Sequence, residues 1–153
     1  MATIKQIKDK VDLARKGIEQ ETARIILQFE QEILDLVREK QLYDQGIDGL
    51  GKQLAPYKDI TVLLKKYNKY GGDKKTSNTT LKDTGIFYRS FETKYGSFEL
   101  QIFATDEKLG KLIGKYGKNI TKLTTDGEGL LSSEIIRPNL VKYFKTFFKW
   151  LNT

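Results

Sequence analysis

The sequence predicts an α+β fold: a long N-terminal helix, a small antiparallel β-sheet and further helices, one of them an aromatic-rich C-terminal helix. Apolar residues recur at helical intervals from Ile4 to about Leu42, alternate with polar residues up to Ala104, and return to helical spacing after Pro138. Of the 153 residues, 39% are apolar and 11% aromatic. This composition supports a folded core rather than a disordered chain.

The N-terminal helix is longer than one small domain can cover, since about forty helical residues span roughly 60 Å. The apolar stripe of its first half follows a 3-4-3-4 spacing and consists of Ile4, Ile7, Val11, Ala14 and Ile18. Gly17 is the weakest helix former inside it and the candidate position of a hinge. We expect residues 1–40 to form an extended helix whose first half packs on a partner or a second copy, and residues 41–153 to form the α+β body.

Turn residues and periodicity define the elements of the body. Three glycines within 46–51 predict a loop, and a short helix is expected over about Thr61–Tyr70, followed by a polar loop over Asp73–Thr80. The segment Ile86–Ala104 is expected to form two strands of a β-hairpin that flank Tyr95-Gly96.

The C-terminal third is expected to be mostly helical. We expect a helix over 105–116 that Gly117 ends, a short strand over 119–124, and a helix over 125–136 with capping-box spacing at its start. Pro138 is expected to begin the last helix. Its candidate packing residues are Phe147, Phe148 and Trp150.

Composition removes several function classes. The chain has no Cys and no His, which excludes disulfides, thiolate nucleophiles, Cys/His zinc sites and a Ser-His-Asp triad. No apolar run approaches a membrane span, and the N-terminus lacks a signal-type stretch, so we expect no membrane association and no secretion. Residues 58–153 carry 18 basic and 10 acidic residues, whereas residues 1–57 carry nine and ten. The basic body suits DNA or an acidic protein partner.

The triplet Asp83-Thr84-Gly85 is shared with aspartic proteases, in which two carboxylates activate a water molecule. Lys82 stands where such a strand carries an apolar residue, and a second Asp would require a dimer. We therefore favour a structural turn in which Asp83 bonds the backbone and Gly85 adopts a positive φ, with a carboxylate-based hydrolase as a remote alternative.

Two features favour nucleic-acid binding. Gly114-Lys115-Tyr116-Gly117, followed by Lys118, is similar to the GXXG loop of KH domains, which clamps a nucleic-acid backbone. The longer second helix that this pattern needs does not follow, so we favour Gly117 as a helix stop over a KH loop. A second basic cluster, interleaved with tyrosines, could follow a phosphate backbone and consists of Lys65, Lys66, Lys69, Lys74 and Lys75. Neither a phosphate-binding P-loop nor a metal site emerges, so we expect no cofactor.

Several short segments carry a resemblance to a known group of proteins. They are Gln41–Asp48, Gly51–Tyr57, Leu81–Phe91 and Tyr116-Gly117. Taken together in chain order, these segments resemble small proteins of tailed bacteriophages and prophages, especially of Bacteroidetes hosts. They resemble the tail-completion and virion-morphogenesis families more distantly. The distant families share a Leu-x-x-Thr-Gly-x-x-x-x-Ser core, whose positions Thr84, Gly85 and Ser90 occupy here. They often carry a His or acidic residue near the Tyr-Gly turn, where this chain has Lys115 and Lys118.

The resemblance covers about residues 40–150 and implies a non-enzymatic virion component, assembled in the host cytoplasm. It implies a ring of subunits at the head–tail junction or tail end, which binds portal, connector or tail-tube proteins and is able to meet packaged DNA. A nucleic-acid-binding module with a KH-like loop is the alternative.

Overall fold

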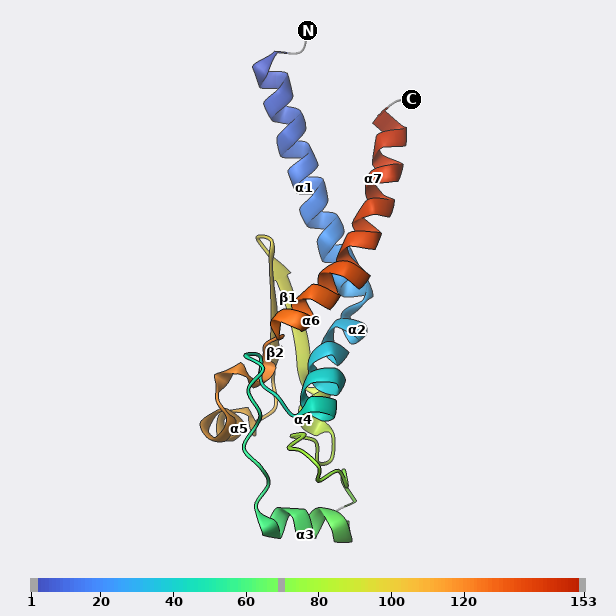
Figure 1. Cartoon of the computed structure of the whole chain (residues 1–153). Coiled ribbons are helices and arrows are strands. Elements are labelled where there is room, and N and C mark those ends of the chain that lie inside the picture. The colour runs from blue at the N-terminus through green and yellow to red at the C-terminus, as the bar shows by residue number, and fades with distance from the viewer. Residues whose placement is uncertain (1–2, 69–70, 152–153) are drawn as a thin grey trace.

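The computed structural model describes residues 3–68 and 71–151, the last four of them by their backbone alone. The fold is α+β, as predicted, with a two-stranded antiparallel sheet among helices. The molecule is elongated: α1 and α7 diverge from one end of the body and carry the two chain ends, and α3 lies at the opposite end (Figure 1). The first six elements are α1 (Ile4–Gln28), α2 (Glu30–Asp35), the π-helix η1 (Leu36–Gln45), α3 (Asp59–Tyr67), α4 (Ile86–Arg89) and β1 (Phe91–Gly96). The others are β2 (Glu99–Ala104), α5 (Leu109–Tyr116), the 3-10 helix η2 (Lys118–Thr121), α6 (Thr125–Leu130), the π-helix η3 (Leu131–Ile136) and α7 (Arg137–Leu151).

The long N-terminal helix is confirmed with one interruption. A capping box at Thr3 starts α1, because its side chain accepts from the Gln6 N–H while the Gln6 side chain accepts from the Thr3 N–H. The helix passes Gly17 without a break and is interrupted at Phe29, where φ is −108°. Helical structure resumes in α2 and η1 and ends at Gly46, whose φ of 66° is left-handed.

The core lies where α2 and η1 pack on the sheet and α4. Its members are buried apolar side chains, and Leu34, Val37 and Leu42 come from the second half of the N-terminal helical segment. The rest of this cluster consists of Leu54, Phe87, Tyr88, Phe91, Ala104 and Ile120. The prediction that the second half of the helix lies on the body is therefore confirmed.

The hairpin is shorter than predicted. Residues 86–89 form α4 instead of a strand, because Gly85 adopts a φ of 82° and the Ser90 N–H donates to the Ile86 carbonyl. Strands β1 and β2 pair in antiparallel register, with Gly96 opposite Glu99. The connecting turn is therefore Ser97-Phe98, two residues after the predicted Tyr95-Gly96.

The C-terminal helices differ from the prediction in two places. Residues 119–124 do not form a strand, since a 3-10 turn follows Gly117 directly. The helix after it, α6, is capped by Thr124, whose side chain accepts from the Gly127 N–H. It then runs without a gap through Pro138 into α7, so the last helix is not a separate element. The Asn139 side chain donates to the Ile135 carbonyl at 2.7 Å, next to the backbone bond that proline cannot make.

The segment between η1 and α4 is mostly loop. Helix α3 starts two residues before the predicted 61–70, and it ends at Tyr67 because Asn68 adopts a left-handed φ of 47°. The polar run over 73–80 is a loop, as predicted. It crosses the body between α3 and α4 (Figure 1).

Candidate functional site

The apolar stripe of α1 loses its cover toward the N-terminus. Four residues spaced by seven lie on one helical face: Ile4, Val11, Ile18 and Ile25. Ile25 is fully buried and Ile18 half-buried, whereas Val11 is 59% exposed and Ile4 88% exposed. Ile7, on the same face, is 53% exposed. The packing face that begins in the core thus continues into solvent along about the first two turns of α1. We call Ile4, Ile7 and Val11 the uncovered seam.

Two elements flank α1 below the uncovered seam. On one side, the Tyr143 hydroxyl of α7 lies 2.7 Å from the position that a Cβ on Gly17 would occupy. Gly17 thus allows the two helices to approach closely where they cross, instead of acting as a hinge. On the other side, the Arg15 guanidinium lies 5.5 Å from the centre of the Phe98 ring at the hairpin turn.

Aromatic side chains of α7 pack on one another. The Tyr143 ring lies 5.6 Å from Phe144 and 5.9 Å from Phe147, and all three are half-buried. Of the C-terminal packing residues predicted from the sequence, Phe147 therefore belongs to this group. The side chains of Phe148 and Trp150 lie outside the described part of the structure.

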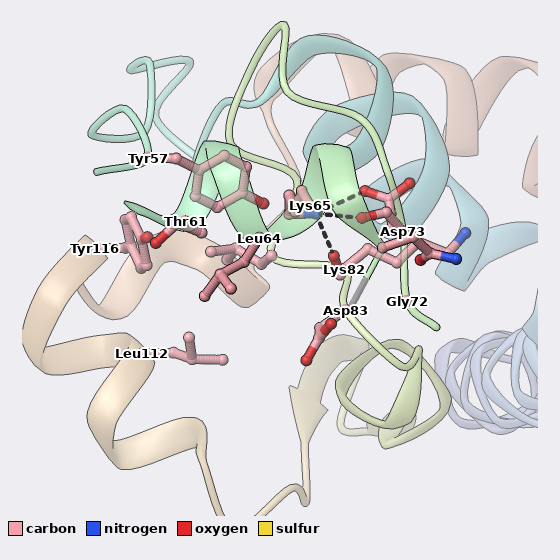
Figure 2. Close-up of a pocket in the computed structure, with 12 residues that line it drawn as sticks. Tyr57, Thr61, Leu64, Lys65, Gly72, Asp73, Lys82, Asp83, Leu112 and Tyr116 are labelled. Carbon is pink, nitrogen blue, oxygen red and sulfur yellow. Dashed lines mark hydrogen bonds and ion pairs between the residues drawn. The ribbon is translucent and has the colours of Figure 1, made fainter. Parts of the chain in front are cut away.

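The predicted lysine cluster divides into internal and external members. The Lys65 ammonium is buried, and donates to the Asp73 carboxylate, the Asp73 carbonyl and the Lys82 carbonyl, each at 3.0 Å (Figure 2). Lys75 donates to the Tyr43 carbonyl at 2.6 Å. Lys66 and Lys74 are exposed, and Lys69 lies outside the described residues. Two of the predicted nucleic-acid contacts therefore fix the fold from within.

Asp73 is a central residue that the sequence analysis missed. Burial disfavours its carboxylate, but the hydrogen bond and charge of Lys65, together with hydrogen bonds from the Lys75 backbone and Thr80, hold the pKa of Asp73 below its ordinary value. The carboxylate also accepts from Thr80 and Tyr43, each at 3.2 Å. Tyr57 bonds the Thr80 hydroxyl at 3.1 Å and extends the network. Only the three-dimensional fold brings these groups together, so no spacing in the sequence marks them.

A cavity of about 340 Å³ opens beside this network, between α3 and α5 (Figure 2). Apolar side chains from both helices and from the 71–85 loop line it, among them Leu64, Leu81 and Leu112. The Lys65–Asp73 pair lies at its edge and is already saturated with partners. Within the described part of the chain, no buried side-chain polar atom is left without a hydrogen bond.

The KH-like segment has the geometry of a helix end. Gly114 lies inside α5, and Gly117, with a φ of 92°, ends it. Lys115 and Lys118 are exposed, and the Lys115 ammonium lies 4.8 Å from the centre of the Tyr116 ring. One 3-10 turn follows where a KH fold has its second helix.

The Asp83 turn has a structural contribution. Gly85 adopts the predicted positive φ, but the prediction that the Asp83 side chain bonds its own backbone is wrong, because this side chain is exposed and makes no such bond to the described part of the chain. The Asp83 carbonyl accepts from the Asp73 N–H at 3.0 Å instead. Among residues 3–68 and 71–151, no three acidic side chains lie close enough together to hold a metal ion.

No protein-family model, curated protein or solved structure matches this chain. None of the helices in the described ranges is both long and apolar enough to cross a membrane.

Proposed function

We propose that this protein is a non-enzymatic structural subunit of a larger assembly, joined to it through α1. The uncovered seam carries the proposal. Three large apolar side chains more than half exposed along one helical face are costly to leave in water, and each contributes about 1.5–3 kcal/mol when fully buried. A packing face that leaves its own domain is typical of a helix completed by a neighbouring molecule.

The assembly that we propose is the virion of a tailed bacteriophage, at the head–tail junction or tail end. The resemblance over about residues 40–150 to tail-completion and virion-morphogenesis proteins supports it. In this proposal, subunits form a ring on portal, connector or tail-tube proteins, and the basic body faces an acidic neighbour or packaged DNA.

Association with the products of neighbouring virion genes tests the proposal. The protein is co-expressed with the portal, connector and tail-tube proteins encoded beside it, and complexes are isolated by size. We expect the full chain to co-purify with one of them, and a seam variant with Ile4→Ser, Ile7→Ser and Val11→Ser to lose that association. A chain that joins none of these proteins and is missing from purified particles would contradict the proposal.

A matched control comes from the other face of the same helix. Leu13 and Leu27 are exposed but lie on the opposite side of α1 from the seam. Leu13→Ser with Leu27→Ser removes a similar apolar area, and we expect it to leave the association intact.

The exposed Lys115 and Lys118 support nucleic-acid binding as the second candidate. Binding of single strands that weakens steeply with salt, and that is lost in a variant with Gly114→Asp and Lys115→Asp, is its expected signature. Undiminished binding by this variant would exclude the loop as the clamp.

A further inference from the structure

Positive and negative charge are separated along each of the two helical segments that diverge from the body, one containing α1 and the other containing α7. We define the tips as residues 4–16 of α1 and residues 137–151 of α7, and the roots as residues 17–35 and 125–136, which join the tips to the body. The tip of α1 has five basic and two acidic residues, and its root has one basic and five acidic. The tip of α7 has four basic and no acidic residues, and its root has three acidic and no basic.

The two segments therefore have the same polarity. Together, the tips carry a net charge of +7 and the roots −7. Both tips lie at the same end of the molecule (Figure 1). This end is basic and presents the uncovered seam, and an acidic zone lies next to it.

We propose that a second copy of this chain covers the seam, in a two-fold antiparallel arrangement that places the tips of each subunit on the roots of the other. Four helical segments then lie side by side, and the seam of each subunit faces the root of the other. The proposal rests on the assembly function and names the first partner of the same surface.

Charge favours this orientation over the parallel one. Helices that pack together lie about 8–10 Å apart, which is close to the screening length of about 8 Å at physiological salt. Charges on neighbouring helices therefore still interact. Parallel pairing would place two net charges of +7 against each other, whereas antiparallel pairing places each +7 against a −7. The pattern also favours a copy of this chain over an unrelated partner, because a two-fold contact requires a surface that is complementary to itself.

The seam has the spacing that such a bundle needs. Its 3-4 intervals are those of helices that pack nearly parallel or antiparallel along a shared line of contact. The exposure of this face rises from root to tip, so an antiparallel partner meets the most exposed apolar residues of one subunit near the root of the other.

Charge reversal tests the proposal, with sedimentation equilibrium of the full chain as the measurement. The tip variant carries Lys5→Glu, Lys8→Glu and Lys10→Glu, and the root variant carries Glu32→Lys, Glu128→Lys and Glu134→Lys. All six side chains are exposed. We expect the wild type to dimerise and each variant alone to dimerise at least about tenfold more weakly. In an equimolar mixture, the unchanged +7 tips of the root variant face the unchanged −7 roots of the tip variant, so we expect the mixture to dimerise more tightly than either variant alone.

Folding defects are controlled in two ways. Acidic residues near the start of a helix stabilise it, so the tip variant is not expected to unfold α1. A matched variant carries Lys66→Glu, Lys74→Glu and Lys111→Glu, which are exposed lysines of the body. It has the same change in net charge, and we expect wild-type dimerisation.

A spin label reports the orientation. The chain has no Cys, so Lys8→Cys provides a single attachment site on the α1 tip. With the two-fold axis near the boundary of tip and root, labels of an antiparallel dimer are separated by about 25 Å along the helix, against about 10 Å in a parallel dimer.

A chain that stays monomeric, a tip variant with wild-type affinity, or a short label distance would each overturn the proposal. The outcome is separable from the assembly function. A monomer that binds a neighbouring virion protein through the seam would refute the dimer but support the assembly function. A dimer that enters no particle would support the dimer but refute the assembly function.

Discussion

The buried ion pair between Lys65 and Asp73 yields a quantitative prediction. Both side chains are only 10% exposed, and once the carboxylate is gone the Lys65 ammonium keeps two neutral carbonyl partners and the face of the Tyr57 ring at 4.9 Å. Removing one member of a buried pair leaves an uncompensated charge, which typically costs about 3–5 kcal/mol. We therefore expect Asp73→Ala to lower the free energy of unfolding by about that amount.

Urea denaturation followed by circular dichroism measures this loss. Asp83→Ala is the matched control, because this nearby carboxylate is exposed, and we expect it to cost less than about 0.5 kcal/mol. In the double variant with Lys65→Met, the loss is expected to be well below the sum of the single losses, since no charge is left buried.

The pair also predicts the acid limit of stability. Because the folded pKa of Asp73 is lower than its ordinary value of 3.8, its contribution is fully present above that value and is lost as pH falls through the lowered pKa. The Asp73→Ala protein should therefore lose less stability than the wild type between pH 4 and acid unfolding. A cost below about 1 kcal/mol at neutral pH would refute the reasoning and free Lys65 for external contacts.

Three further predictions concern other parts of the fold. Gln41 is buried and links η1 to the backbone of residues 122–124 through two hydrogen bonds. In urea denaturation, Gln41→Met is expected to lower the free energy of unfolding by about 2–4 kcal/mol, and a loss below about 1 kcal/mol would contradict this. Burial, followed by the charge of neighbouring groups, raises the pKa of Tyr88 above its ordinary 10.0. The contribution of the neutral Tyr88 side chain to the stability of the folded protein is therefore present below pH 10 and is lost as pH rises through the raised pKa. Absorbance titration should show that Tyr88→Phe removes a tyrosine that ionises only with alkaline unfolding, and loss of an early-titrating group instead would count against it. In the wild type, Gly17→Ala is expected to change the free energy of unfolding little, because the gain in helix propensity is offset by crowding of the Tyr143 hydroxyl. In a Tyr143→Phe background, the same substitution is expected to stabilise the protein by about 0.5–1 kcal/mol. Equal effects in both backgrounds would show that the two residues are not in contact.

Local patterns predicted much of the fold. The helical interval of apolar residues identified the N-terminal helix and its division into an outer half and a half that lies on the body. Alternation of apolar and polar residues predicted a hairpin within 86–104, and the strands of the structure lie at 91–96 and 99–104. Gly117 was predicted as a helix end from its position after an amphipathic segment, and its φ of 92° confirms this.

The errors arose where long-range contacts decide the local conformation. The apolar residues of 86–89 fit either period, and packing of Phe87 and Tyr88 in the core accompanies the helical choice. Pro138 is a frequent helix start, but here it continues an existing helix. The external assignment of Lys65 failed because Asp73 and the Lys82 carbonyl meet it only after the 71–85 loop has folded over α3.

The crossing of α1 and α7 has a consequence for the order of folding. Gly17 and Tyr143 lie close together although most of the chain separates them. Contacts between distant positions close the largest loops and tend to form late. During synthesis at about 5–20 residues per second, the first helix emerges several seconds before the last one can reach it. The face of α1 that contacts α7 is therefore exposed during synthesis until the C-terminal helix has been made.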